Sequence, residues 1–181
     1  MASEQTGVAM DWGKFTVVEA TDSDTDALLS PRDDAARWLL DQGIDPWQPG
    51  EIPYSWERDD EYLIFVRWRG EDRVGTGTIL WDDPVIWDEQ PVRAGYVHNL
   101  VEARPLGGQG LGVGLLQWAE HCMTESGRSL ARFDCGAQNR KLRDPHESVG
   151  YRWARDHHYA WLNPGPELAL HVKIVRDDRP T

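Results

Sequence analysis

The segment of this 181-residue sequence with the clearest chemical potential is a run of glycines past the middle of the chain. Residues 107–112 read Gly-Gly-Gln-Gly-Leu-Gly, directly before an apolar pattern of helical period. Glycines have no Cβ atom and let a backbone approach an anion closely, and the N–H groups of a helix's first turn attract phosphate. The pattern therefore predicts a phosphate-binding turn that opens a helix from about Gly110 to Glu125, ended by Gly127.

Other phosphate-binding turns fit the segment less well. A P-loop carries Gly-Lys-Ser/Thr after its loop, whereas Val113 follows Gly112 here. The dinucleotide fingerprint GxGxxG needs a third glycine where the sequence has Leu115. A glycine turn without any ligand stays open as an interpretation, because a single turn of this kind is weak evidence.

Titratable side chains in one strand-like run are candidates for moving a proton. Strand alternation places His98 on one face with Leu100 and Glu102. A histidine titrates near neutral pH and suits a general base, with simple packing in a strand as the alternative reading of His98. Glu102 is the second candidate base. Cys135 has no histidine near it in the sequence, so we interpret it as a core residue rather than a nucleophile.

The elements that position these residues are predicted from periodicity and from helix-ending residues. One helix is expected from Ser30, with Pro31 in its first turn, to Gly43, and another from Arg140 to Ser148. Strands are expected over 15–19, 62–68, 74–81, 95–102, 131–135, 151–162 and 167–176, the second and third forming a hairpin and the last two an antiparallel pair. This order implies an α/β (α+β) fold, a mixed sheet of about seven strands with helices on both faces.

Composition limits the classes of partner. The formal net charge of −12 disfavours nucleic acid, because an acidic surface repels phosphate backbones. We expect no membrane span, no signal peptide and no metal site, and the two cysteines, Cys122 and Cys135, fit a reducing cytoplasm. We expect one domain over 13–181 after a flexible segment at 1–12.

Several spaced segments resemble the GNAT superfamily of N-acetyltransferases. In chain order they are Tyr-Val-His-Asn-Leu-Val-Glu at 96–102, the glycine turn at 107–112, Phe-Asp-Cys at 133–135, Asn139, and His-Glu-Ser-Val-Gly-Tyr at 146–151. The resemblance covers about residues 15–176. It implies the GNAT fold, acetyl-CoA as the acyl donor, and direct attack of an amine on the thioester without an acyl-enzyme.

The resemblance also implies roles for individual residues. It places the acyl-pantetheine along the strand after Asn99 and the pyrophosphate on backbone N–H groups of the glycine turn. The expected coenzyme-binding residues are Leu100, Val101, Glu102, Gly107, Gly108, Gln109, Gly110, Leu111, Gly112, Val113, Asn139, Arg140 and Arg143. Gly107 departs from the family's usual Arg or Gln, and Glu102 from its valine. His146 stands where the family often has a tyrosine that protonates the leaving thiolate, and a protonated imidazole is the expected substitute.

The expected acceptor is a small cationic amine, such as a polyamine, an amino sugar antibiotic or an amino-acid derivative. The acidic chain attracts cations, and aromatic faces beside carboxylates bind ammonium groups. The residues that suggest this are Trp38, Trp47, Trp56, Trp68 and Trp81 with Glu51, Glu57, Asp59, Asp60 and Glu61. An acyl-CoA sensor without turnover and a protein or peptide N-acetyltransferase remain alternatives. The oligomeric state, a homodimer included, and the length of the acyl group are left open.

Overall fold

A computed structural model describes residues 10–11, 16–20, 25–43, 48–51, 62–69, 72–88, 92–104, 111–137, 139–158 and 167–176. The chain forms two compact units, one from Met1–Thr78 with Asn99–Trp118 and one from Ile79–His98 with Ala119–Thr181. Strands β4 (Asp72–Leu80) and β5 (Ala94–Glu102) and helix α3 (Leu111–Glu125) contribute residues to both units.

The first unit also holds the chain's first strands and its longest described helix. These are β1 (Met10–Asp11), β2 (Thr16–Glu19), α1 (Thr25–Asp41) and β3 (Tyr62–Arg69). Its strands are neighbours in the order β1-β2-β3-β4-β5, and β2 runs antiparallel to both β1 and β3. Just past β5, the Ala103 N–H donates to the Val74 carbonyl of β4 at 2.8 Å. The expected hairpin strands are confirmed as β3 and β4.

Helix α1 begins earlier than its sequence predicts. The expected N-terminus at Ser30 is wrong, because the helix begins at Thr25 and Pro31 lies inside it. A proline inside a helix removes one backbone hydrogen bond. Burial offsets that loss, since Leu28 and Ala36 are 2% and 0% exposed and lie two helical turns apart on one face. The C-terminus near Gly43 is confirmed by that residue's positive φ of 74°.

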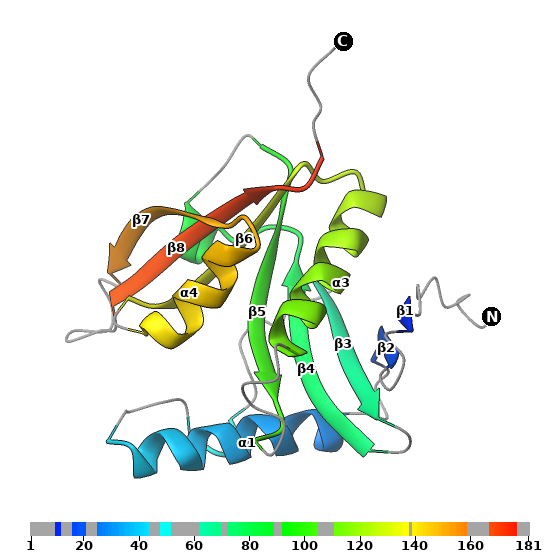
Figure 1. The fold of residues 1–181 in the computed structure, drawn as a ribbon, viewed down its shortest axis with the longest axis vertical. Helices are drawn as coiled ribbons and strands as arrows, with labels where there is room; N and C mark the ends of the chain where they lie inside the picture. The colour runs from blue at the N-terminus through cyan, green and yellow to red at the C-terminus, as the bar shows by residue number, and fades with distance from the viewer. Residues whose placement is uncertain are drawn as a thin grey trace. The chain divides into compact units, whose positions relative to one another are not determined.

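The second unit contains most of the remaining elements. These are α2 (Pro84–Trp87), β6 (Leu130–Gly136), α4 (Arg140–Ser148), β7 (Arg152–His158) and β8 (Glu167–Ile174). Its strands are neighbours in the order β4-β5-β6-β8-β7. Strand β5 is parallel to β6, whereas β6 with β8 and β8 with β7 are antiparallel, so the mixed sheet is confirmed. Figure 1 shows α4 lying over β6 and β8.

A close contact between β5 and α3 fixes the strand in the second unit. A Cβ atom on Gly95 would lie 2.5 Å from Cγ of Met123, closer than real contacts allow, so any other residue there would have to displace the Met123 side chain. Met123 is fully buried, as is Leu170 on β8. Close packing of this kind holds the strand rigidly, so β5 presents His98, three residues after Gly95, from a fixed backbone.

The prediction from the sequence omitted two short elements, β1 and α2. Among the described residues the sheet order contains eight strands rather than about seven, and the additional one is the two-residue β1, within the segment expected to be flexible. Helix α2 was also missed, although Asp83 followed by Pro84 is a common way to begin a helix. Helix α4 has the bounds expected for it.

Candidate active site

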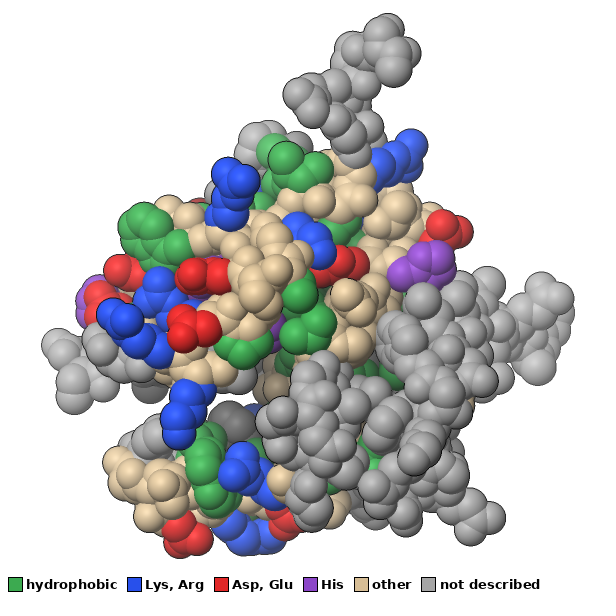
Figure 2. Space-filling view, in the orientation of Figure 1, with side chains coloured by type: hydrophobic (Ala, Val, Ile, Leu, Met, Phe, Trp, Pro, Cys, Tyr) green, Lys and Arg blue, Asp and Glu red, His purple; other side chains and the backbone are tan. Residues whose placement is uncertain are grey.

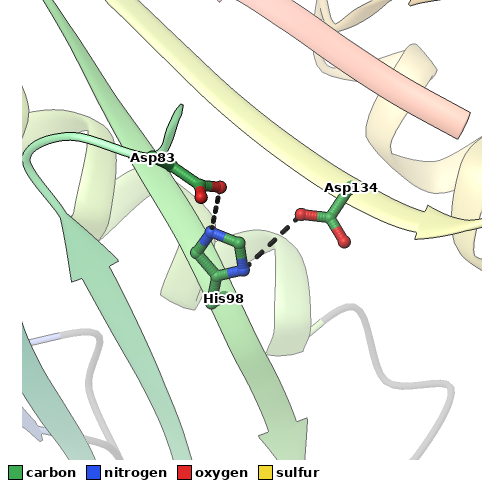
Figure 3. A group of neighbouring side chains, drawn as sticks. All are labelled: Asp83, His98 and Asp134. Atoms are coloured by element: carbon green, nitrogen blue, oxygen red, sulfur yellow. Dashed lines mark hydrogen bonds and ion pairs between the residues drawn. The ribbon is translucent and has the colours of Figure 1, made fainter. Parts of the chain in front are cut away.

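Strands β5 and β6 stop pairing at a point where each carries a titratable residue. Their parallel pairing ends with Val97 opposite Phe133. The next residues are His98 and Asp134, and Nδ1 of the histidine lies 3.5 Å from Oδ1 of the aspartate. The carboxyl end of parallel pairing is where open α/β sheets commonly bind ligands. The two side chains therefore meet at a chemically suitable position (Figure 3).

Asp83 holds His98 from its other side. Nε2 of His98 and Oδ2 of Asp83 form a hydrogen bond of 3.0 Å, with both side chains buried. The other oxygen, Oδ1, accepts from the backbone N–H of Ile86 at 3.4 Å as the N-cap of α2. Both oxygens of Asp83 are thus engaged, so this carboxylate fixes the orientation of the imidazole ring. Figure 3 shows the ring between the two aspartates.

Asp134 is held less tightly than Asp83. Its 3.5 Å contact with His98 is longer than a hydrogen bond, and its buried Oδ1 has no hydrogen-bond partner within the described residues. Its side chain is 14% exposed, against 0% for Asp83. Burial raises the pKa of Asp134, an effect that the nearby His98 opposes and Asp83 reinforces. Asp134 is therefore the carboxylate of this group with hydrogen-bonding capacity to spare.

The same three side chains have a composition that binds metals. One ligand atom from each of Asp83, His98 and Asp134 lies within 4.8 Å of the others. The two carboxylates, however, face different nitrogens of one imidazole, Nε2 and Nδ1. One ion can bond to only one of these nitrogens, so the arrangement suits proton sharing better than shared metal ligation.

His146, the candidate acid, lies in a different environment. It is buried on α4, with its ring centroid 4.4 Å from that of Phe133 and in edge contact. Burial, with a smaller contribution from nearby His171, lowers the pKa of His146 from 6.5 to about 4. The imidazole is therefore uncharged at neutral pH, which argues against the protonated donor expected from the sequence.

The regular alternation expected along β5 is interrupted within the strand. Asn99 has a φ of 51°, in the left-handed region, directly after His98. A left-handed residue interrupts the regular alternation of a strand, so a common face for His98 and Glu102 does not follow from their spacing. Glu102 is half-buried beside Gly75 of β4, whose added Cβ would lie 3.4 Å from its Cγ.

The expected coenzyme-binding residues are described only in part. Gly107, Gly108, Gln109 and Gly110 lie outside the described residues. Leu100 and Val101 are half-buried on β5, and Gly112 and Val113 are half-buried in the first turn of α3, which begins at Leu111. These positions all fall in the first unit.

The three remaining coenzyme candidates lie in the second unit, around the start of α4. Arg140 is exposed, and the Asn139 carbonyl accepts the backbone N–H of Arg143. The guanidinium of Arg143 donates to the Ala137 carbonyl at 3.1 Å and lies 3.7 Å from Glu147. Of the two arginines, Arg143 already has partners within its own unit.

Sequence reasoning missed both aspartates of the site. For Asp134, the indication was a carboxylate between the apolar residues Phe133 and Cys135 of a predicted strand, since buried carboxylates are rare unless they are paired. For Asp83, it was the helix-capping dipeptide that it forms with Pro84. Neither indication alone identifies His98 as the common neighbour, because that depends on the tertiary structure.

Comparison with known proteins gives the family. A model of the acetyltransferase (GNAT) family matches residues 32–151. An N-acetyltransferase of Bacillus subtilis, YesJ, is 28% identical over 130 residues, which make up 65% of this chain and 71% of that protein.

Solved structures show the same fold. The ribosomal-protein-S5-alanine acetyltransferase of Vibrio fischeri superposes with a TM-score of 0.68 at 15% identity, covering 96% of this chain and all of that one (100%). An aminoglycoside 6'-N-acetyltransferase in complex with coenzyme A gives a TM-score of 0.61 at 14% identity, covering 91% of this chain and 99% of that one.

The chain belongs to the GNAT family of acetyltransferases, because the family model spans most of its length. It is an N-acetyltransferase with acetyl-CoA as its donor, and enzymes of this family act on amine acceptors. Within the described residues, no helix has the length and apolar character needed to cross a membrane.

Proposed function

We propose that this enzyme transfers an acetyl group from acetyl-CoA to the primary amine of a small cationic molecule by direct attack. The observation that carries the proposal is His98 held between two carboxylates where β5 and β6 stop pairing. An amine is protonated near neutral pH and must lose a proton before it attacks, so the site needs a proton acceptor. His98 is our candidate base, with Glu102 as the second.

The coenzyme is proposed to bind along β5 and at the beginning of α3. Leu100, Val101 and Glu102 follow His98 closely on the same strand and would lie along the acyl-pantetheine. The first turn of α3 would bind the pyrophosphate through backbone N–H groups. A Cβ on Gly112 would meet no atom within 4 Å, so a side chain there has room without disturbing the protein.

Gly112 therefore offers a test of coenzyme binding. Gly112→Asp adds a negative charge where the pyrophosphate is proposed to lie, and Gly112→Ala is the matched uncharged control. We expect the alanine variant to keep the rise in melting temperature caused by acetyl-CoA. At an acetyl-CoA concentration of 100 times the Kd, binding adds about 2.7 kcal/mol to the free energy of unfolding. The aspartate variant should fold but lose this rise. Normal binding by the aspartate variant would place the phosphate site elsewhere.

The proposal of a cationic acceptor rests on the net charge of the chain and on the substrate class named for one structural neighbour. The net charge of −12 favours cations, and one structural neighbour is an aminoglycoside acetyltransferase. Two of the tryptophans expected to bind the acceptor already contact an arginine of their own unit. The guanidinium carbon of Arg104 lies 3.5 Å from the centroid of Trp38, and that of Arg128 lies 5.3 Å from the centroid of Trp81. Trp47, Trp56, Glu57, Asp59, Asp60 and Glu61, and the side chain of Trp68, lie outside what the structure describes.

The surface seen in Figure 2 places acidic and basic side chains side by side on the described residues. The net charge of −12 gives a field that attracts cations, and salt screens such a field. We would measure release of coenzyme A with cationic, neutral and anionic amines at low and high salt. Cationic amines should be favoured, and their advantage should shrink as salt rises. A salt-independent preference for an anionic or apolar amine would overturn the cationic acceptor.

The similarity to the ribosomal-protein-S5-alanine acetyltransferase supports a second candidate function, transfer of the acetyl group to a protein N-terminus. That function predicts turnover on peptides and little on small amines, so peptides belong in the same panel. An acyl-CoA sensor predicts binding without release of coenzyme A from any amine. Cys122 and Cys135 are not joined in a disulfide, which supports a reducing, cytoplasmic setting for the enzyme.

A further inference from the structure

We propose that Asp134 is a catalytic residue that takes the proton of the acceptor amine, acting as one unit with His98, while Asp83 is a positioning residue behind them. This inference rests on the proposed N-acetyltransfer and names the atoms at which the proton is received. It assigns a role to two aspartates that the sequence patterns did not single out.

The first support is an unused hydrogen-bonding position. Oδ1 of Asp134 is buried and lacks a hydrogen-bond partner among the described residues, although it lies 3.5 Å from Nδ1 of His98. An unpaired buried oxygen is costly, and a donor from a bound molecule removes that cost. The N–H of an amine is such a donor. The side chain of Asp134 is 14% exposed against 0% for Asp83, although Oδ1 itself is buried.

The second support is the number of protons that the group must hold. The Nε2 hydrogen bond to Asp83 requires one proton. A second proton placed between Nδ1 and Oδ1, 3.5 Å apart, occupies one lone pair of that oxygen and leaves its other lone pair for a donor from a bound molecule. With two protons the three side chains carry a net charge of −1 however the protons are arranged. Accepting a third proton makes the group neutral, which a buried site favours.

The reaction then balances as follows. The ammonium of the acceptor gives one proton to the Asp134–His98 unit and becomes a neutral amine. Its nitrogen lone pair forms a bond to the acyl carbon, and the bond from that carbon to sulfur breaks. The nitrogen loses its second proton, the leaving thiolate gains one, and the group of three returns its extra proton to water. No oxidant or other co-reactant is needed.

The groups that act on Asp134 come from several elements. They are Asp83 beside α2, His98 on β5 and His157 on β7. The two histidines favour ionised Asp134, whereas burial and Asp83 favour its neutral form. These opposing effects suit a group that gains and loses a proton during each turnover.

The decisive experiment is Asp134→Asn, which keeps the shape of the side chain but cannot take up the proton. Its kcat should fall by about 10²- to 10⁴-fold near neutral pH. The deficit should shrink as pH rises toward the pKa of the amine, because solvent then supplies the unprotonated amine. The rise in melting temperature with acetyl-CoA should remain. A kcat within threefold of the wild type at every pH would overturn the role of Asp134.

Asp83→Asn and Asp83→Glu test positioning. The asparagine variant should lower kcat and displace the acid limb of the pH–rate profile, and glutamate should restore part of the rate. An unmoved profile in Asp83→Asn would refute the positioning role. The matched control is Asp82→Asn, which removes an exposed charge from the neighbouring position and should leave the profile unchanged.

Failure of this inference is distinct from failure of the proposed function. If the wild type releases no coenzyme A with any amine, the proposed function fails. If the wild type turns over and Asp134→Asn matches it, only the assignment of Asp134 fails.

Discussion

The two faces of strand β6 hold buried histidines in opposite chemical environments. Asp134 contacts His98, which lies between two carboxylates. The preceding residue, Phe133, packs against His146 at 4.4 Å between ring centroids and against His171 at 4.7 Å. Successive residues of a strand point to opposite faces, so one peptide separates a polar group from an aromatic one.

The difference shows that neighbours, rather than residue type, decide what a buried histidine can do. Two carboxylates lie beside the His98 ring, whereas burial, together with nearby His171, lowers the pKa of His146 to about 4. The sequence treated both as candidates for proton transfer. The structure supports chemistry on the His98 face and packing on the His146 face.

The largest expected effect separates the two faces by activity. His98→Gln removes a titrating group and should lower kcat by about 10²- to 10⁴-fold. His146→Phe should change kcat by less than about threefold, because the ring that it replaces is already uncharged and buried. Both variants should keep their stabilisation by acetyl-CoA, measured by thermal unfolding. A folded His146→Phe enzyme with a hundredfold loss would instead support the role of acid.

The free energy of unfolding should also distinguish substitutions at positions 98 and 146. Phenylalanine at position 98 would leave the buried Asp83 without its partner and should cost about 3–5 kcal/mol. At position 146 it should be neutral or stabilising, because Nδ1 of His146 is buried and has no hydrogen-bond partner in the described part of the chain. His146→Ala, which leaves a cavity, should cost about 3 kcal/mol. Urea unfolding of the three variants measures these differences, and equal losses from phenylalanine at both positions would contradict the comparison.

Acid should weaken the aromatic face. His146 has a folded pKa of about 4 against 6.5 when unfolded, so the unfolded state binds more protons between these values. Stability is therefore lost as pH falls from about 6.5 to about 4, by on the order of 3 kcal/mol. His146→Phe should reduce the slope of the free energy of unfolding against pH over this range.

Asp134 affects the pH dependence of stability in the opposite direction to His146. Its pKa is raised in the folded state, so protonation in acid removes the cost of burying its charge. Asp134→Asn should therefore steepen the loss of stability in acid. Urea unfolding of both variants and the wild type at pH 7, 5.5 and 4.5 tests the pair. Identical slopes in all three proteins would contradict both assignments.

The sequence predicted the frame of this molecule better than its site. Strand β6, α4 and the β7–β8 pair follow from periodicity and turn residues, which are local properties. Asp83 and Asp134 lie 51 positions apart in the chain and meet only through His98. The left-handed Asn99 was likewise not predicted, since asparagine tolerates that conformation without requiring it. Contacts and backbone irregularities of this kind depend on tertiary packing, which a single sequence does not encode locally.

The smallest expected effect concerns Cys135, two residues after Phe133 on β6 and expected from the sequence to be a core residue. It is buried, which confirms that expectation, and burial raises the pKa of its thiol from 9.0 to about 11, with the charge of Asp134 adding to the shift. The thiolate is the reactive form, so at pH 8 Cys135 should react about 100-fold more slowly than an ordinary cysteine thiol. Cys122 is half-buried and should react faster. Labelling with an aromatic disulfide reagent in Cys122→Ser and Cys135→Ser variants measures each thiol separately. Asp134→Asn removes the neighbouring charge and should speed labelling of Cys135, whereas Asp82→Asn should not. Rapid labelling of Cys135 in the otherwise unchanged protein would show that this face of β6 opens to solvent, and the contrast between the two faces would then fail.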